Sequence, residues 1–271
     1  MCWDTSRHQP AENTHQPQKE PMKLHPLSVT LLAVSLTIAS FAANAAAPTS
    51  PAECAALPSH AQLKAALVSA RQSDNGGFNL DMWGSVVGRS GTVCAVAFTG
   101  ATFADQWPGS RAVAAQKAYT ANAFSLPALA LATANLYNAT QPGGSLFGLQ
   151  ESNPVNAALA YQGAASAWGQ VHDPLVGYRM GGINVFGGGL ALYNAKGVLI
   201  GAVGVSGDSS CADHAIAWRT RNNLNLDFVP AGVGPGSIDQ IAFQGDWKQP
   251  HCINPAKEDA VVLALPATKQ R

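Results

Sequence analysis

The segment SRAVAAQKAYTANAF at positions 110–124 places a cation and a hydroxyl among apolar side chains. At about 100° per residue, one stripe of a helix contains Val113, Lys117, Thr120 and Phe124. One interpretation is that Lys117 extends its ammonium to water over the helix edge. The other is that this face borders a pocket, where Lys117 pairs with a ligand carboxylate and Thr120 donates a hydrogen bond. The residues alone leave both interpretations open.

Histidine is the next residue type that could bind a metal. Beyond residue 45 the chain has His60, His172, His214 and His251, and no two have the close spacing of a helix-borne metal pair. An isolated histidine is more often a surface or core residue than a ligand. His172 and His214 are the better candidates because both lie near glycine-rich segments.

The segment GVSGDS at 204–209 resembles the motif around a hydrolase serine but has the wrong spacing. A nucleophile elbow needs Gly-x-Ser-x-Gly, whereas Ser206 is followed by Gly207 and then Asp208. A tight turn between a strand and a helix explains these glycines better. The sequence therefore gives no support for a serine hydrolase.

The chain begins with a stretch that predicts export. After Met22 and a basic start, an apolar run ends at Ala43, Asn44 and Ala45, which form an A-x-A cleavage site. We expect residues 22–45 to be a signal peptide, and the alternative is a retained anchor. The run is short for a membrane span, which needs about 20 apolar residues. Residues 1–21 are polar and indicate a misread start or a disordered tail.

The composition excludes some partners. Sixteen basic residues balance sixteen acidic ones, so no basic patch indicates nucleic acid. Only 12% of the residues are charged and 47% are hydrophobic, which predicts a large core and apolar surface hidden in an oligomer interface. We expect a periplasmic or secreted protein without a stable membrane anchor.

The elements that must position these residues follow from periodicity and turn signals. Helices are predicted over 55–73, 110–124, 126–138 and 209–222, and strands over 80–88, 92–99, 181–194 and 198–206. Residues 139–155 indicate a loop. This order predicts an α+β domain with an antiparallel sheet and helices packed on it. We expect a linker over 46–60, a domain over 61–223 and an irregular extension over 224–271.

Four cysteines beyond residue 45 predict two disulfides in an exported chain. Cys54 opens the first helix, and Cys94 lies in the strand pair on which that helix should pack. Cys211 starts the last helix, and Cys252 lies in the extension. We therefore expect the pairs Cys54–Cys94 and Cys211–Cys252.

The order and spacing of several motifs resemble the GlcG/HbpS haem-binding family, formerly described as haem-degrading. The motifs are RAVAAQKAYTANAF at 111–124, GSLFGLQ at 144–150, GG at 181–182 and GVLIGAVGVSGDSSCADHAIA at 197–217. The resemblance spans about 61–222. It implies a sheet packed between helices in a profilin-like α-β-α fold, symmetric homo-oligomers, and binding of haem or a related tetrapyrrole.

On that resemblance we expect an exported haem carrier, scavenger or sensor accessory. Haem needs an apolar slot, cations for its propionates and usually an axial ligand. The propionate candidates are Arg111 and Lys117, and the other ligand-binding candidates are Thr120, Phe124 and Asp213. His172 and His214 are the axial candidates. The alternatives are an enzyme of small hydroxy acids or tetrapyrroles that uses Lys117 and Asp213, and a structural oligomeric module with a vestigial pocket.

Overall fold

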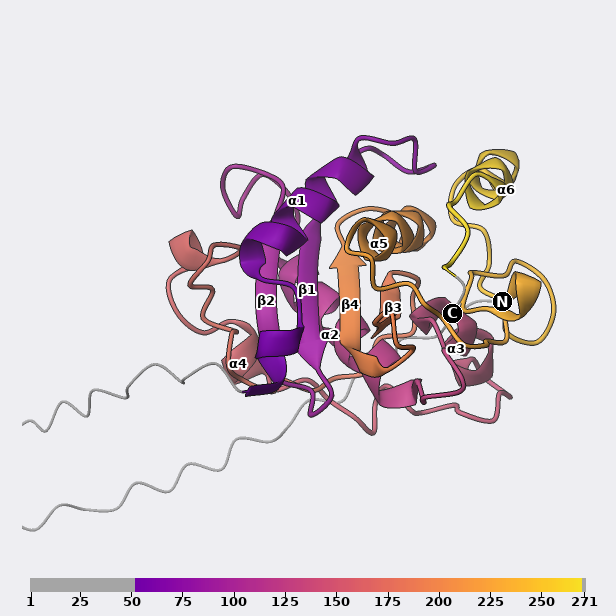
Figure 1. Ribbon diagram of the computed structural model, residues 1–271, viewed down its shortest axis with the longest axis horizontal. Coiled ribbons are helices and arrows are strands. Elements are labelled where there is room, and N and C mark those ends of the chain that lie inside the picture. Colours follow the sequence, from indigo (N-terminus) through magenta and orange to yellow (C-terminus); the bar gives the residue numbers. More distant parts are fainter. Residues whose placement is uncertain (1–51, 270–271) are drawn as a thin grey trace, which may run out of the picture. The chain divides into compact units, whose positions relative to one another are not determined.

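The structure is a computed structural model that describes residues 52–269 (Figure 1). The predicted start 1–21, the signal peptide 22–45 and the first part of the linker lie outside the described residues. Four strands form one sheet: β1 (Trp83–Gly88), β2 (Val93–Phe98), β3 (Gly189–Tyr193) and β4 (Leu199–Ser206). Their order is β2-β1-β4-β3, and every neighbouring pair is antiparallel.

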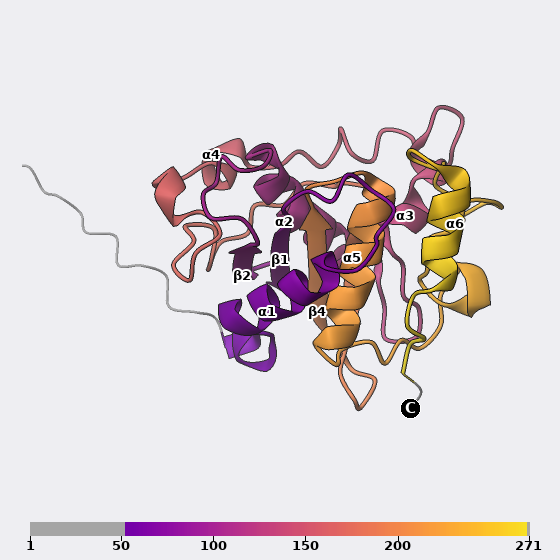
Figure 2. The same ribbon diagram turned by 90° about the horizontal axis from the view of Figure 1, so that it is seen from above.

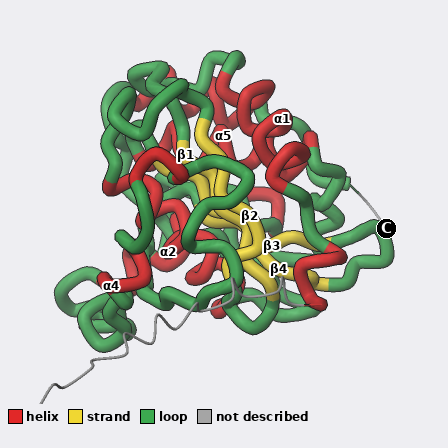
Figure 3. The backbone as a smooth tube through the Cα atoms, turned by 90° about the vertical axis from the view of Figure 1, so that its left-hand side faces the viewer, coloured by secondary structure: helices red, strands yellow, loops and turns green. Residues whose placement is uncertain are grey.

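Helices cover both faces of this sheet. In Figure 1, α1 (His60–Arg71) and α5 (Ser210–Asn223) lie in front of the strands and α2 (Gly109–Phe124) lies behind them. Figures 2 and 3 show the same layers from above and from the side. The strands are almost fully buried because both faces are covered. The predicted α+β domain with a sheet between helices is therefore confirmed.

Two of the predicted helices form close to their expected places for local reasons. Ser59 and Gln62 make a capping box that starts α1, after a short 3-10 helix, η1 (Ala52–Ala56), so the helix is shorter than predicted. The apolar face of this helix, formed by Leu63, Ala66, Leu67 and Ala70, is buried. Helix α5 begins after Ser209, whose side chain caps it by accepting a hydrogen bond from the Ala212 N–H.

The predicted helix over 126–138 is wrong. Only α3 (Thr133–Leu136) and a 3-10 turn, η2 (Asn138–Thr140), are helical within it. The Ala130 N–H donates to the Ala231 carbonyl oxygen at 2.7 Å, so a tertiary hydrogen bond takes a donor that a helix would use. Tertiary pairing has overridden local helix propensity here.

The predicted strand over 181–194 is correct only in its second half, because β3 begins at Gly189. Gly188 has φ +123°, which breaks the extended backbone. A Cβ at Gly188 would also lie 3.1 Å from both the Lys117 and Asp213 side chains. The residues before β3 are therefore irregular because the chain must pass closely over these side chains.

The segment between η2 and β3 contains only short helices, α4 (Ala157–Ala160) and η3 (Ala165–Ala167). Its last part runs along the free edge of β2. The Val93 N–H donates to the Tyr178 carbonyl oxygen, and the Gly177 N–H donates to the Val93 carbonyl oxygen, both at 2.9 Å. This pairing fixes the end of the segment to the sheet edge.

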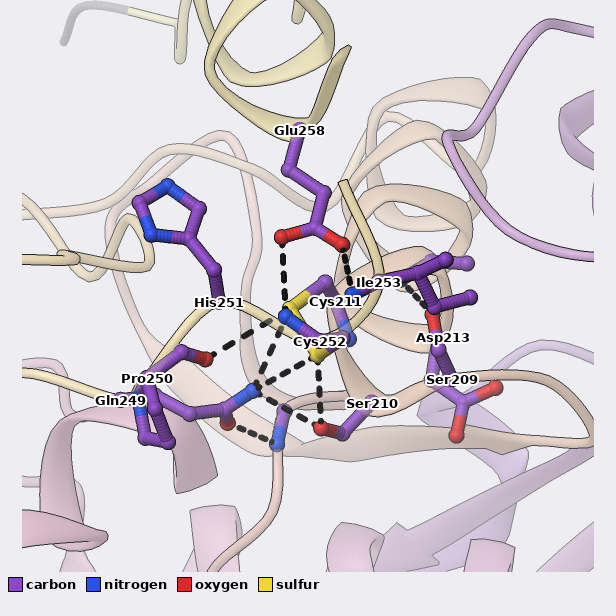
Figure 4. The surroundings of a disulfide bond; sticks show 12 residues. Ser209, Ser210, Cys211, Asp213, Gln249, Pro250, His251, Cys252, Ile253 and Glu258 are labelled. Carbon is purple, nitrogen blue, oxygen red and sulfur yellow. Dashed lines mark hydrogen bonds between the residues drawn. A yellow bond between two sulfur atoms is a disulfide. The ribbon is translucent and has the colours of Figure 1, made fainter. Parts of the chain in front are cut away.

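The C-terminal extension was predicted to be irregular, and this is wrong for α6 (Pro255–Leu263). Asn254 caps the helix, and Pro255 stands at its first position, where proline is favoured. A short 3-10 turn, η4 (Pro235–Ser237), precedes it. Figure 4 shows the Glu258 carboxylate turned back over the helix start, where it accepts from the Cys252 and Ile253 N–H groups.

Both predicted disulfides are present. Cys54 and Cys94 have Cα atoms 5.3 Å apart, and Cys211 and Cys252 have Cα atoms 6.0 Å apart. The second bond joins the start of α5 to the extension (Figure 4). A buried ion pair between Arg221 on α5 and Asp239 in the extension adds a further connection, with contacts of 2.5 and 2.9 Å.

Candidate functional site

Helix α2 carries two buried cations, Arg111 and Lys117, with exposed fractions of 1% and 2%. Both were predicted to contact haem propionates. Lys117 Nζ instead donates to Asp213 Oδ2 on α5 at 2.7 Å. Its ammonium therefore neither reaches water over the helix edge nor faces an open pocket, and it pairs with another residue proposed for the same site.

The Asp213 carboxyl has an unusual environment. Burial raises the pKa of Asp213 to about 6, although the Lys117 ammonium favours the charged form. Its other oxygen accepts the Asp208 N–H at 2.9 Å. Gly188 packs against both side chains, since a Cβ there would lie 3.1 Å from each. Both side chains are buried, so the pair is closed to a ligand in this structure.

Thr120 and Phe124 lie on the same helix, but their side chains contact other residues of the protein. The Thr120 hydroxyl donates to the Gln116 carbonyl oxygen at 2.8 Å and accepts the Asn184 N–H at 2.9 Å. Phe124 is partly buried against an apolar cluster that includes Val185. These two predicted pocket residues thus fix the segment that leads into β3.

His214 is fully buried on α5. Its Nε2 accepts the Ile241 N–H at 3.1 Å, so the extension covers one of its two possible iron-binding atoms. Burial lowers the pKa of His214 to about 3, and the Arg221 and Lys117 charges act in the same direction. The ring is therefore neutral at physiological pH. Its Nδ1 is buried without a hydrogen-bond partner in the described structure.

His172 has the opposite surroundings. It is exposed and borders a cavity of about 420 Å³ whose lining includes Gln162, Val171, Asp173, Pro174, Val176 and Tyr178. Within residues 52–269 the His172 imidazole has no hydrogen-bond partner. The other three described histidines are engaged, with the Gly169 carbonyl oxygen, the Ile241 N–H and the Asp259 carboxylate.

Arg111 binds Asp173, one of the residues that line this cavity. Its guanidinium binds the Asp173 carboxylate in a bidentate pair, with N···O distances of 2.9 and 2.5 Å. Nη1 donates to the Ala160 carbonyl oxygen at 2.7 Å, and the group stacks 4.7 Å above the Trp168 ring. Arg111 is thus paired with Asp173, the residue that follows His172. Lys117 is paired with Asp213 at a separate place in the fold.

Sequence reasoning missed Asp173, Trp168 and Tyr178. A weak signal existed for Asp173, because Asp-Pro favours a turn. Its Oδ1 accepts the Leu175 N–H at 2.8 Å, two residues on, as in an Asx-turn. Nothing in the sequence spacing indicated that Asp173 would neutralise Arg111.

The cavity beside His172 fits two of the needs of haem. Its lining is mainly apolar, and it presents an imidazole with no partner in the described structure. An imidazole is a common axial ligand of haem iron. The two cations of α2 do not fit a propionate role as placed, because each is already neutralised by a carboxylate.

Comparisons with known proteins identify related chains. A family model described as "Haem degrading protein HbpS-like" matches residues 59–221. Among solved structures, the haem complex of PduOC is 26% identical, with a TM-score of 0.42 and coverage of 61% of this chain and 91% of that one. Klebsiella pneumoniae ORFY is 25% identical, with a TM-score of 0.41 and coverage of 61% and 87%.

A further solved structure is a double mutant of HbpS from Streptomyces reticuli. It is 17% identical, with a TM-score of 0.39 and coverage of 73% of this chain and 97% of that one. A search of curated proteins found no match. Among the described helices, none is both long and apolar enough to cross a membrane.

Proposed function

This chain belongs to the HbpS-like family, and from that premise we propose that it is an exported protein that binds haem or a related tetrapyrrole. His172 is the proposed iron ligand, and the adjoining cavity is the proposed slot for one edge of the macrocycle. The assignment rests on one observation. In the described structure, the His172 imidazole has no hydrogen-bond partner and borders an apolar cavity. His172 is thus favoured over His214, whose Nε2 is already occupied.

The proposed site does not use the buried cations for propionates. If Arg111 or Lys117 turned to a propionate, Asp173 or Asp213 would stay buried without its counter-ion. Breaking a buried pair in this way costs about 3 to 5 kcal/mol. We therefore place the propionates at the exposed rim, where water solvates them.

Export is part of the proposal for two reasons. Residues 22–45 have the three parts of a secretory signal. Both disulfides are of the kind that persists outside the cytoplasm. The role would be that of a carrier, scavenger or sensor accessory, and family membership favours a homo-oligomer.

The alternative is an enzyme that uses Lys117 and Asp213. Its supporting observation is the raised pKa of Asp213, because shifted carboxyl groups occur at acid–base sites. The burial of both side chains argues against it. Turnover of small hydroxy acids that disappears in Asp213→Asn, while the variant stays folded, would restore this alternative.

A hemin titration followed by Soret absorbance tests the favoured function. We expect wild type to bind and His172→Ala to bind at least about tenfold more weakly, or about 1.4 kcal/mol. His60→Ala and His251→Ala serve as controls, because their rings contact protein atoms. Equal weakening in all three variants would remove His172 as the specific ligand. Absence of binding by wild type would remove the haem assignment.

A further inference from the structure

The buried carboxylate of Asp173 holds the segment 160–178 together through hydrogen bonds. Asp173 has an exposed fraction of 2% and accepts four hydrogen bonds. Two come from the Arg111 guanidinium. The others come from the Gly169 N–H at 2.7 Å and the Leu175 N–H at 2.8 Å. The carboxylate thus ties both flanks of its own loop to helix α2.

Arg111 extends the same network toward the start of the segment. It donates to the Ala160 carbonyl oxygen and stacks over Trp168. Trp168 Nε1 donates to the Gln162 carbonyl oxygen at 3.1 Å, and Gln162 Nε2 donates to the Pro174 carbonyl oxygen at 2.6 Å. These contacts form a connected network within the loop. Arg111 links this network to α2.

The network and the cavity share residues. Gln162, Asp173 and Pro174 take part in the hydrogen bonds and also line the cavity. The lining also includes Tyr178, whose carbonyl oxygen accepts a hydrogen bond from the Val93 N–H of β2. One end of the segment is thus fixed to the sheet, and the part that carries His172 is fixed by Arg111.

His172 lacks a hydrogen-bond partner of its own in the described structure, so its position depends on the backbone of its neighbour Asp173. A metal ligand is usually oriented by surrounding hydrogen bonds, and loss of such bonds typically costs about 10- to 100-fold in metal affinity. Between residues 52 and 269, no bond to the ring serves this purpose. The strong restraint next to it is the buried Arg111–Asp173 pair.

We propose that Arg111 and Asp173 form a positioning clamp that holds His172 at the cavity in a geometry ready for iron. This inference rests on the proposed haem function. Arg111 therefore acts on the bound group through the loop and makes no contact with a propionate. A guanidinium is required because its planar fork bonds both carboxylate oxygens while a third N–H reaches Ala160.

The first part of the test needs no haem. Amide hydrogen exchange is measured for wild type, Arg111→Lys and Arg221→Lys. Arg221 is a matched control, because it forms a similar buried bidentate pair with Asp239 in the extension. We expect Arg111→Lys to speed exchange at Gly169 and Leu175, and Arg221→Lys to leave those amides unchanged. Unchanged exchange in Arg111→Lys would overturn the clamp.

The second part is a hemin titration of the same proteins, with the absorption spectrum of the bound form. Arg111→Lys should bind about tenfold more weakly, at the lower end of the range for a lost orienting contact, and show an altered ligation spectrum. Added imidazole should restore the wild-type spectrum. Arg221→Lys should match wild type. Asp173→Asn, which keeps the shape of the side chain, should resemble Arg111→Lys. Circular dichroism confirms that each variant is folded.

The outcomes separate the two proposals. If the loop loosens in Arg111→Lys but hemin affinity and spectrum stay unchanged, the clamp inference is overturned and the haem function stands. If Arg221→Lys weakens hemin binding equally, the effect is general destabilisation and the inference is also overturned. If wild type binds no hemin, the function fails, and with it the ligand-positioning role.

Discussion

Arg111 and Lys117 lie on the same helix and are equally buried, yet their surroundings differ. The partner of Arg111, Asp173, also accepts two backbone N–H groups from its loop. The partner of Lys117, Asp213, accepts one backbone N–H, and its pKa is raised to about 6. The first pair organises a surface loop beside a cavity, whereas the second joins α2 to the first turn of α5 on the other side of the sheet.

The difference shows that a cation on an apolar helix face is not evidence for a ligand site by itself. Its role depends on which carboxylate the fold brings to it from elsewhere in the chain. Asp173 comes from a loop at the sheet edge, and Asp213 comes from the first turn of α5. Neither partnership is visible in the spacing of α2.

The largest effect should follow from removing the Lys117 charge. Lys117→Met leaves Asp213 buried without its cation, so we expect a loss of about 3 to 5 kcal/mol in the free energy of unfolding near pH 8. Urea denaturation measures this. The double variant Lys117→Met, Asp213→Leu should recover much of the loss, because it removes both charges. A loss below about 1 kcal/mol, the size typical of an exposed pair, would contradict the assigned burial.

The second prediction concerns pH and the same carboxyl. The pKa of Asp213 is about 6 in the folded protein and about 3.9 in an unfolded chain, so the folded state binds more protons between these values. The stability that Asp213 contributes is fully present below about pH 4 and is lost as pH rises through about 6. Its size is on the order of 3 kcal/mol.

Urea denaturation of wild type and Asp213→Asn from about pH 4 to about pH 7.5, a range that brackets both pKa values, isolates this contribution. The stability of wild type relative to the variant should fall as pH rises. A relative stability that rises with pH would mean that Lys117 outweighs burial and that the pKa of Asp213 lies below its usual value.

A smaller effect is expected at Thr120. Thr120→Val keeps the shape of the side chain but leaves the Asn184 N–H without its acceptor, which should cost about 1 to 3 kcal/mol in stability. Hemin affinity should stay unchanged, because Thr120 holds the segment before β3 and lies outside the His172 cavity. Weakened hemin binding with unchanged stability would return Thr120 to the binding site.

The fold was predictable where local patterns and tertiary structure agree. The hairpin strands, the face of α1 and the cap of α5 all follow from periodicity and capping residues. The extension was different, because α6 carries only a short apolar pattern and its start depends on Glu258 binding nearby backbone N–H groups. The segment 126–138 looked helical, but its backbone pairs with the extension.

The candidate site was less predictable than the fold. Arg111 was named for the cation that haem propionates need, and His172 and His214 from residue type alone. Sequence spacing could not show which carboxylate or backbone group each would meet. His172 and His214 are indistinguishable in sequence terms. Only burial separates them, since the Ile241 N–H occupies Nε2 of His214 while His172 borders the cavity.

The most direct test of the account is imidazole rescue in His172→Gly. Wild type, His172→Gly and His214→Gly are titrated with hemin with and without added imidazole, and the Soret band and ligation spectrum are recorded. We expect only His172→Gly to lose the wild-type spectrum, and imidazole, which can occupy the vacated position, to restore it. A wild-type spectrum in His172→Gly without imidazole, or its loss in His214→Gly while that variant stays folded, would contradict the assignment of His172 as the haem ligand.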